Sequence, residues 1–281
     1  MQYDDINCFN IRFDRGVLFV NIDHPPMNLM NMELLLGLQE LGQRCENDSR
    51  VNVIVFDSND PDFFIAHGDL SSMIGREGSP QPKGKEPGFV HSVIDRYRTM
   101  EKVSIAKING AARGGGSEFA LAMDMRFGVT GKAVFGQPEA LLGIIPGAGG
   151  TQRLPRLIGK ARALEMILGC ADIDAECAER YGYLNRALPE NEIDNFVDSL
   201  AYRIASLPQA TLAAAKQAVL QYSELDLASG MIEEEYLSMQ LLYTSEAQRR
   251  MQLFMDNGGQ QRDKEKEFDI FVNAFENTPI S

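Results

Sequence analysis

Three consecutive glycines are the strongest sign of a chemical site in this chain. Gly114, Gly115 and Gly116 separate an apolar segment at 104–110 from a helix that we expect to begin near Ser117. Because glycine has no Cβ, the backbone at such a turn can approach a bound molecule closely. The first N–H groups of a helix lack partners inside it and favour negative charge. The turn therefore predicts a site for an oxygen that carries or gains negative charge.

Two nucleotide-binding motifs are excluded by the residues themselves. A dinucleotide fingerprint needs G-x-G-x-x-G, but the third glycine position counted from Gly114 holds Phe119. A phosphate-binding P-loop needs Gly-Lys followed by Ser or Thr, and the residues that follow the Gly-Lys pairs of this chain are Glu86, Ala133 and Ala161. A glycine turn without phosphate-binding residues fits an oxyanion site, in which backbone N–H groups stabilise developing charge.

Two glutamates stand in or beside glycine-rich segments. Glu118 falls in the first turn of the expected helix, and Glu139 directly follows Pro138. Taken alone, Glu118 is an ordinary partner for the helix dipole and Glu139 an ordinary loop carboxylate. The segments around them decide between these explanations and catalysis.

Four segments together resemble the enoyl-CoA hydratase/isomerase (crotonase) family. The resemblance covers roughly residues 10–190, in order along the chain. A combination of this length is far more specific than any single glycine motif. The segments are FIAHGDL at 64–70, NGAARGGGSE at 109–118, FGQPEALLG at 135–143 and IIPGAGGTQRLPRLIG at 144–159.

The resemblance implies a role for each of several residues. It assigns the backbone N–H groups of Gly68 and Gly115 to the oxygen of an acyl-CoA thioester, and acid–base chemistry to Glu118 and Glu139. It also implies a set of residues beside the bound coenzyme A, which are Ala66, His67, Asp69, Leu70 and Gly114. Coenzyme A is part of the substrate, so no separate cofactor is expected.

The retention of both glutamates favours the addition of water to 2-enoyl-CoA thioesters. Hydration needs a base for the water and an acid for the α-carbon, and two carboxylates can supply both if burial and mutual repulsion raise the pKa of one of them. Isomerisation, thioester hydrolysis or decarboxylation on the same oxyanion site remain alternatives, as does a non-catalytic oligomeric scaffold.

The chain departs from the family pattern at three places. His67 replaces a usual glycine, and we interpret it as a partly exposed loop residue. Arg113 stands where many relatives have an apolar residue, so it either meets a carboxylate on the acyl group or forms a salt bridge. The basic stretch expected near 256–260 reads Asp-Asn-Gly-Gly-Gln. Lysines that could replace it at the coenzyme A phosphates are Lys83, Lys85, Lys264 and Lys266.

Composition narrows the class of protein further. The 281 residues carry a formal charge of −13, which argues against a nucleic-acid-binding surface because such a surface needs clustered basic residues. Four cysteines without CxxC spacing predict reduced thiols, and the scattered His24, His67 and His91 predict no metal site. The polar N-terminus and the lack of an apolar run long enough to span a membrane lead us to expect a cytoplasmic protein.

The elements that position these residues follow from periodicity. Residues 8–22 predict two strands joined by a turn, and the short apolar runs 51–56, 104–110 and 125–130 predict buried strands. Helical segments lie between them, and 32–46 is the clearest. Alternating strands and helices favour an α/β fold with largely parallel, buried strands. The family resemblance implies a spiral of β-β-α turns.

The last quarter of the chain predicts helices only. Residues 74–88 lack periodicity and predict a surface loop. After about residue 190, helices are expected at 191–206, 209–222, 226–256 and 263–278. We expect an α/β core with the acyl-CoA site at 1–205 and a helical region at 206–281. By resemblance, this helical region would hold together a homotrimer or homohexamer.

Overall fold

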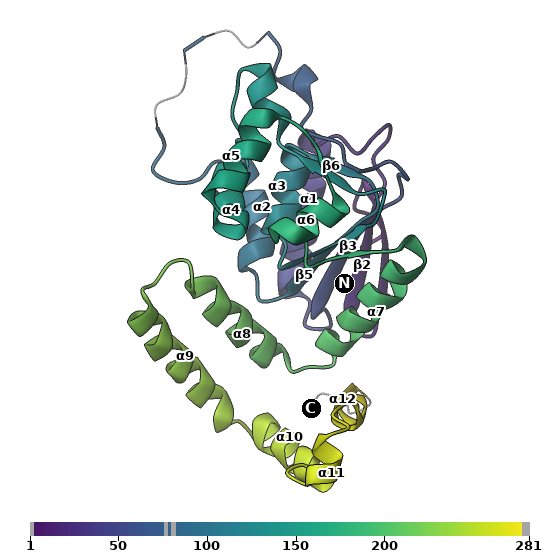
Figure 1. The fold of residues 1–281 in the computed structure, drawn as a ribbon, viewed down its shortest axis with the longest axis vertical. Coiled ribbons are helices and arrows are strands. Elements are labelled where there is room, and N and C mark those ends of the chain that lie inside the picture. Colours follow the sequence, from purple (N-terminus) through teal and green to yellow (C-terminus); the bar gives the residue numbers. More distant parts are fainter. Residues whose placement is uncertain (1–2, 76–77, 80–82, 277–281) are drawn as a thin grey trace.

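The chain begins with the predicted β-hairpin. The computed structural model describes residues 3–75, 78–79 and 83–276, and in it β1 (Phe9–Asp14) pairs antiparallel with β2 (Val17–Ile22) (Figure 1). The two turn residues, Arg15 and Gly16, have φ values of 45° and 81°. Two left-handed residues in a two-residue loop match the twist of the strands that they connect. The hairpin prediction is confirmed.

Six of the described strands form one sheet, in the order β1-β2-β3-β5-β7-β10. All neighbours from β2 to β10 pair in parallel, and the middle of the sheet is buried, as predicted. The strands that follow the hairpin in this sheet are β3 (Val53–Ser58), β5 (Val103–Ile108), β7 (Met125–Val129) and β10 (Arg186–Leu188).

A second, smaller sheet was not predicted. Its order is β4-β6-β8-β9, and each strand has only two or three residues, too short for alternation to be visible in the sequence. The long strands β3, β5 and β7 are each followed by a strand of this sheet and then by a helix, so the chain repeats a β-β-α turn. The predicted spiral is confirmed. The strands are β4 (Phe63–Ile65), β6 (Ala111–Arg113), β8 (Val134–Gly136) and β9 (Ile173–Asp174).

Helices cover the sheets on both sides (Figure 1). The predicted helix at 32–46 is confirmed as α1, and 191–206 as α7, whose buried face packs on one side of the larger sheet. The helices of this part are α1 (Met32–Asn47), α2 (Phe89–Thr99), α3 (Gly115–Ala122), α4 (Gly150–Ile158), α5 (Lys160–Gly169), α6 (Ala175–Tyr181) and α7 (Glu190–Ala205), with the 3-10 helices Leu70–Ser72 and Pro138–Leu142.

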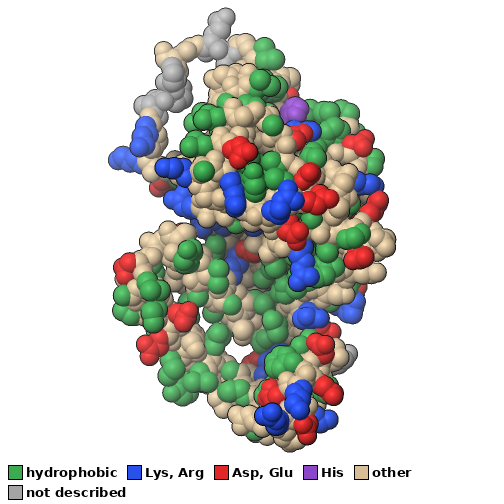
Figure 2. Space-filling view, viewed as in Figure 1, with side chains coloured by type: hydrophobic (Ala, Val, Ile, Leu, Met, Phe, Trp, Pro, Cys, Tyr) green, Lys and Arg blue, Asp and Glu red, His purple; other side chains and the backbone are tan. Residues whose placement is uncertain are grey.

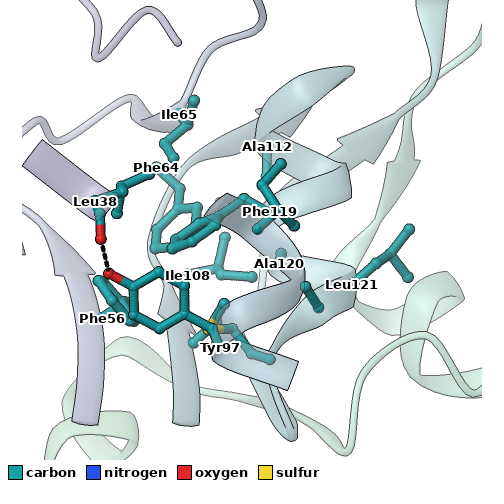
Figure 3. Packing of buried hydrophobic residues seen from close by; sticks show 14 of the residues in the cluster. Leu38, Phe56, Phe64, Ile65, Tyr97, Ile108, Ala112, Phe119, Ala120 and Leu121 are labelled. Carbon is teal, nitrogen blue, oxygen red and sulfur yellow. Dashed lines mark hydrogen bonds between the residues drawn. The ribbon is translucent and has the colours of Figure 1, made fainter. Parts of the chain in front are cut away.

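An aromatic cluster fixes α3 against the rest of the core (Figure 3). Phe119, one residue after the predicted acid Glu118, lies edge-on to Phe56 and Tyr97, with ring centroids 5.1 and 5.5 Å apart. The buried Tyr97 hydroxyl donates to the carbonyl of Leu38 at 2.6 Å. Edge-to-face rings contribute about 0.5–1.5 kcal/mol per pair beyond their burial. The helix that carries the glycine turn is therefore rigidly mounted.

The C-terminal region is helical, as predicted, but its segments are shorter than expected. The predicted helix 226–256 is wrong as a single element, because it is divided at Tyr243-Thr244, where the Thr244 side chain accepts from the N–H of Ala247 and caps a new helix. The predicted helix 263–278 is divided as well, and its last two residues lie outside the described ones. The helices are α8 (Gln209–Gln221), α9 (Leu227–Leu242), α10 (Ser245–Asp256), α11 (Arg262–Glu265) and α12 (Asp269–Glu276).

Two further predictions concern the loop and the domain boundary. The described residues of 74–88 belong to no helix or strand, whereas residues 76–77 and 80–82 of this loop lie outside the described part. Helix α7 ends at Ala205, next to the predicted boundary, and the division into two domains stays a prediction. Over the residues that the structure describes, every helix is too short or too polar to cross a membrane.

Candidate active site

The loop after β4 presents a free backbone amide. Met30 forms a parallel bridge with Gly68: the Met30 N–H donates to the carbonyl of His67 at 2.9 Å, and the Asp69 N–H donates to the carbonyl of Met30 at 3.1 Å. These two bonds hold the residues on each side of Gly68 and leave its own N–H unused. In the described part of the chain, the Gly68 amide donates to no protein acceptor.

The glycine turn adjoins this loop. Gly115 is the first residue of α3, so its N–H has no partner within the helix. A Cβ placed on Gly115 would lie 3.6 Å from the Gly68 nitrogen and 3.0 Å from the Met30 sulfur. A Cβ on Gly116 would lie only 2.1 Å from the carbonyl oxygen of Ile65, so glycine is required for β4 and α3 to pack this closely. The structure thus brings the two predicted amide donors into adjoining positions.

Glu118 is buried and held by two backbone amides. Its side chain is only 2% exposed, and its Oε1 accepts from the N–H groups of Ala148 and Gly150, each at 2.7 Å. Burial raises the pKa of this carboxyl, and the two N–H donors oppose that rise only in part. The donors come from the glycine-rich segment where α4 begins, which was predicted only as a turn and helix start. That segment therefore also orients a carboxylate.

Glu139 is half-buried in the short helix Pro138–Leu142. Burial raises its pKa to about 7, and the nearby charge of Glu118 adds to the rise. A Cβ on Gly114 would lie 2.8 Å from Glu139 Oε1, so the first glycine of the turn leaves room for this carboxylate. Gly114 also has a φ of 50°, in the region that favours glycine.

Gln137 links the surroundings of the two glutamates and was missed in the sequence. Its side chain is fully buried. With the amide oriented to satisfy its neighbours, it accepts from the Ser117 hydroxyl at 3.1 Å and donates to both carboxylate oxygens of Glu139, at 3.1 and 3.3 Å. Ser117 in turn shares a hydrogen bond of 2.9 Å with the buried hydroxyl of Tyr183. The only sequence signal for Gln137 was its place in the FGQPE segment, and Met30 had none.

Four of the five residues predicted beside coenzyme A lie in one continuous loop at 66–70, and the fifth, Gly114, stands in the glycine turn before α3. The Ala66 N–H donates to the carbonyl of Met27, and Asp69 accepts from the Ser71 N–H at the start of the 3-10 helix that opens with Leu70. His67 is partly exposed, as predicted, and its Cβ lies 3.8 Å from the Cβ position of Gly114. Their contact with coenzyme A stays a prediction.

Arg113 forms a salt bridge rather than offering a free guanidinium. Its Nε and Nη2 donate to the two carboxylate oxygens of Asp172, at 2.7 and 2.5 Å. This bidentate pair satisfies the charge that could otherwise meet a carboxylate on the acyl group. Of the two predicted possibilities for Arg113, the structure shows the salt bridge.

Known proteins resemble this chain over nearly its whole length. The sequence profile described as enoyl-CoA hydratase/isomerase matches residues 12–263. A short-chain-enoyl-CoA hydratase of Clostridium acetobutylicum is 31% identical over 254 residues, which cover 90% of this chain and 96% of that protein. A 2,3-dehydroadipyl-CoA hydratase of Escherichia coli is 33% identical, over 85% of this chain and 92% of that protein.

Solved structures agree with the sequence comparisons. The crystal structure of an enoyl-CoA hydratase from Bacillus anthracis superimposes with a TM-score of 0.81 at 27% identity and covers 89% of this chain and 96% of that one. Fold, motif order and sequence identity lead to one conclusion. The chain belongs to the enoyl-CoA hydratase/isomerase (crotonase) family and is an enzyme of that family.

Proposed function

We propose that this enzyme adds water across the double bond of 2-enoyl-CoA thioesters. The observation that carries the proposal is the meeting of two unused amides, at Gly68 and Gly115, with two carboxyl groups of raised pKa, Glu118 and Glu139. Relatives that are named hydratases support the same reaction.

The two backbone N–H groups stabilise the negative charge that develops on the thioester oxygen. Attack of water on the β-carbon pushes electrons through the double bond onto that oxygen, and the N–H groups of Gly68 and Gly115 stabilise the resulting enolate. Each such donor contributes on the order of 2.7–4 kcal/mol to lowering the barrier. Because both amides are held by the surrounding backbone, they need no reorganisation as the charge appears.

The two glutamates move the protons. Glu118 Oε1 is occupied by two amides, so its Oε2 accepts the proton of the attacking water. Glu139, with a pKa of about 7, is protonated in a large share of molecules near neutrality and donates its proton to the α-carbon. Glu118 ends protonated and Glu139 ionised, and proton exchange with solvent restores both. The net addition is one water molecule.

The test follows the loss of absorbance of the conjugated thioester with short and medium enoyl-CoAs. We expect Glu118→Gln and Glu139→Gln each to lower kcat on the order of 10²–10⁴-fold, the usual contribution of a positioned acid or base. Glu179→Gln, at an exposed position on α6, is the matched control and retains full activity. Wild-type enzyme that leaves every enoyl-CoA unchanged contradicts the proposal.

Product mass separates hydration from the alternatives. A hydrated product gains the mass of water, an isomer keeps the substrate mass, hydrolysis releases free coenzyme A, and decarboxylation loses carbon dioxide. The salt bridge of Arg113 to Asp172 leaves the carboxylated-substrate alternative without the feature that motivated it.

We also propose that the C-terminal helices join subunits into a homotrimer or homohexamer. Helix α9 exposes a series of large apolar side chains, and Figure 2 shows hydrophobic side chains gathered along it. Large exposed apolar surfaces mark interaction sites. Sedimentation of the purified protein as a monomer at micromolar concentration would contradict this assembly. The side chains are Leu227, Met231, Ile232 and Tyr236 of α9 and Tyr243 directly after it, each at least 58% exposed.

A further inference from the structure

Three possible metal ligands of different chemistry meet beside the N-terminal hairpin, outside the candidate active site. The Sγ of Cys8, a ring nitrogen of His24 and a carboxylate oxygen of Glu33 all lie within 4.8 Å of one another. The Cys8 sulfur is 3.3 Å from His24 Nδ1. Cys8 directly precedes β1, His24 follows β2, and Glu33 lies in the first turn of α1.

Hydrogen bonds to the backbone of Cys8 and of His24 fix the positions of these two residues. The Asp23 N–H donates to the carbonyl of Cys8 at 2.8 Å and so extends the hairpin by one bond beyond the paired strands. The buried Asn28 holds the backbone of His24 from both sides, since its side chain accepts from the His24 N–H and its own N–H donates to the His24 carbonyl. The side chain of Glu33 is exposed and free to turn.

The spacing of the donor atoms fits a tetrahedral ion. Zinc binds sulfur at about 2.3 Å and nitrogen or oxygen at about 2.0–2.2 Å, which sets its ligand atoms roughly 3.3–3.6 Å apart. Cys8 and His24 already have this separation. The carboxylate of Glu33 lies within 4.8 Å of both donor atoms, and rotation of this exposed side chain brings it closer. Three protein ligands leave a fourth position for water.

The chemistry of the donors selects the kind of ion. Calcium and magnesium require several oxygen ligands, and this cluster offers a single carboxylate. Thiolate and imidazole suit zinc and similar transition metals. We propose that Cys8, His24 and Glu33 form a binding site for one divalent transition-metal ion of the zinc type.

A reactive cysteine is the competing explanation, and the surroundings of Cys8 disfavour it. Reactive cysteines lie in electropositive, partly exposed surroundings, whereas Cys8 is buried and lies near the carboxylate of Glu33. A divalent cation, in contrast, stabilises the thiolate and releases the proton on binding.

The sequence predicted no metal site because its three histidines lie far apart. This cluster instead combines a single histidine with a cysteine and a glutamate from three separate segments. Between His24 and Glu33 runs Met30, whose backbone holds the residues on each side of Gly68. A bound ion therefore ties down both ends of the segment that supports the candidate oxyanion loop, and we expect it to raise the thermal midpoint of unfolding.

The test uses the full chain freed of metal with a chelator. Titration calorimetry with zinc chloride should give one ion per chain. Cobalt(II) should produce the near-ultraviolet charge-transfer band of a thiolate ligand. Glu33→Gln should weaken zinc binding on the order of 10–100-fold or more, since even an indirect partner of a metal ligand contributes that much. Cys8→Ser should abolish the cobalt band.

Two control variants match these changes. Cys177→Ser removes another thiol, and Glu40→Gln removes another exposed carboxylate from α1, and both should bind zinc as the wild type does. Because Glu33 is exposed, we expect Glu33→Gln to fold. Its zinc affinity therefore tests the metal site even if Cys8→Ser does not fold. Zinc binding that is unchanged in Glu33→Gln, or a cobalt complex without the thiolate band, overturns the proposal.

Discussion

Replacing Glu139 by glutamine should change the pH dependence of stability in a defined direction. The pKa of this carboxyl is raised from its ordinary value of 4.5 to about 7, chiefly by burial. A raised pKa in the folded state means that folding favours the protonated form. The stability that belongs to this group is therefore fully present below about pH 4.5 and is lost as the pH rises through 7. Glutamine does not ionise, so the variant lacks this loss.

The size of the effect follows from the shift. One pKa unit corresponds to about 1.4 kcal/mol, so the full shift of Glu139 would correspond to roughly 3 kcal/mol. The side chain is only half-buried, and solvent screening reduces such values, so we expect about 1–2 kcal/mol to remain. Between pH 4.5 and pH 8, the free energy of unfolding of the wild type should fall by this amount relative to Glu139→Gln.

Urea unfolding at both pH values measures the difference. Wild type, Glu139→Gln and the control Glu179→Gln are compared at equal protein concentration, because any association of subunits would add to the apparent stability. The control should follow the wild type. If the wild type and Glu139→Gln keep a constant difference in unfolding free energy across this range, the carboxyl is not buried as described, and its assignment as the proton donor loses its basis.

Two further substitutions test the support of the site. In Gly116→Ala, the new Cβ would lie 2.1 Å from the carbonyl oxygen of Ile65. We expect this overpacking to lower the free energy of unfolding by about 1–3 kcal/mol and to lower kcat as well. Unfolding midpoints and initial rates check the two effects. Tyr97→Phe removes the hydrogen bond of the hydroxyl to the Leu38 carbonyl, which keeps its partner inside helix α1, and should cost about 0.5–1.5 kcal/mol in urea unfolding. KM should stay unchanged, since this hydroxyl donates to α1 and not to a predicted site residue.

The sequence predicted those elements whose pattern is long enough to be visible. The hairpin, α1 and the buried parallel strands have runs of apolar residues or clear helical spacing, and all were correct. The short strands of the second sheet pair through two or three residues each, so they depend on the larger sheet that brings them together. The division at Thr244 was missed because one capping side chain decides it, within residues that otherwise favour helix.

The family motifs predicted the main residues of the candidate site, and the catalytic roles of these residues stay predictions. The motifs pointed to Gly68, Gly115 and both glutamates, which the structure brings together. Gln137 stands inside the same motif, but its amide does not ionise. Residue type alone therefore gives no reason to assign it a role in acid–base chemistry. Met30 contacts the Gly115 position only through the bridge between two distant segments, and no local pattern records such a contact.

The order of the site along the chain follows from the spiral. The loop after β4 supplies Gly68, the next turn supplies Gly115 and Glu118 at the start of α3, and the turn after β8 supplies Glu139. Parallel pairing of β4 with β6, which has an irregularity between Phe63 and Ile65, and of β6 with β8 stacks these turns, so each chemical group comes to the same edge as the one before it. Each group is also fixed by a neighbouring turn, as Glu118 is by the amide of Gly150. It follows that a change in the packing between turns displaces one group relative to the others, and should lower kcat without any catalytic atom being altered.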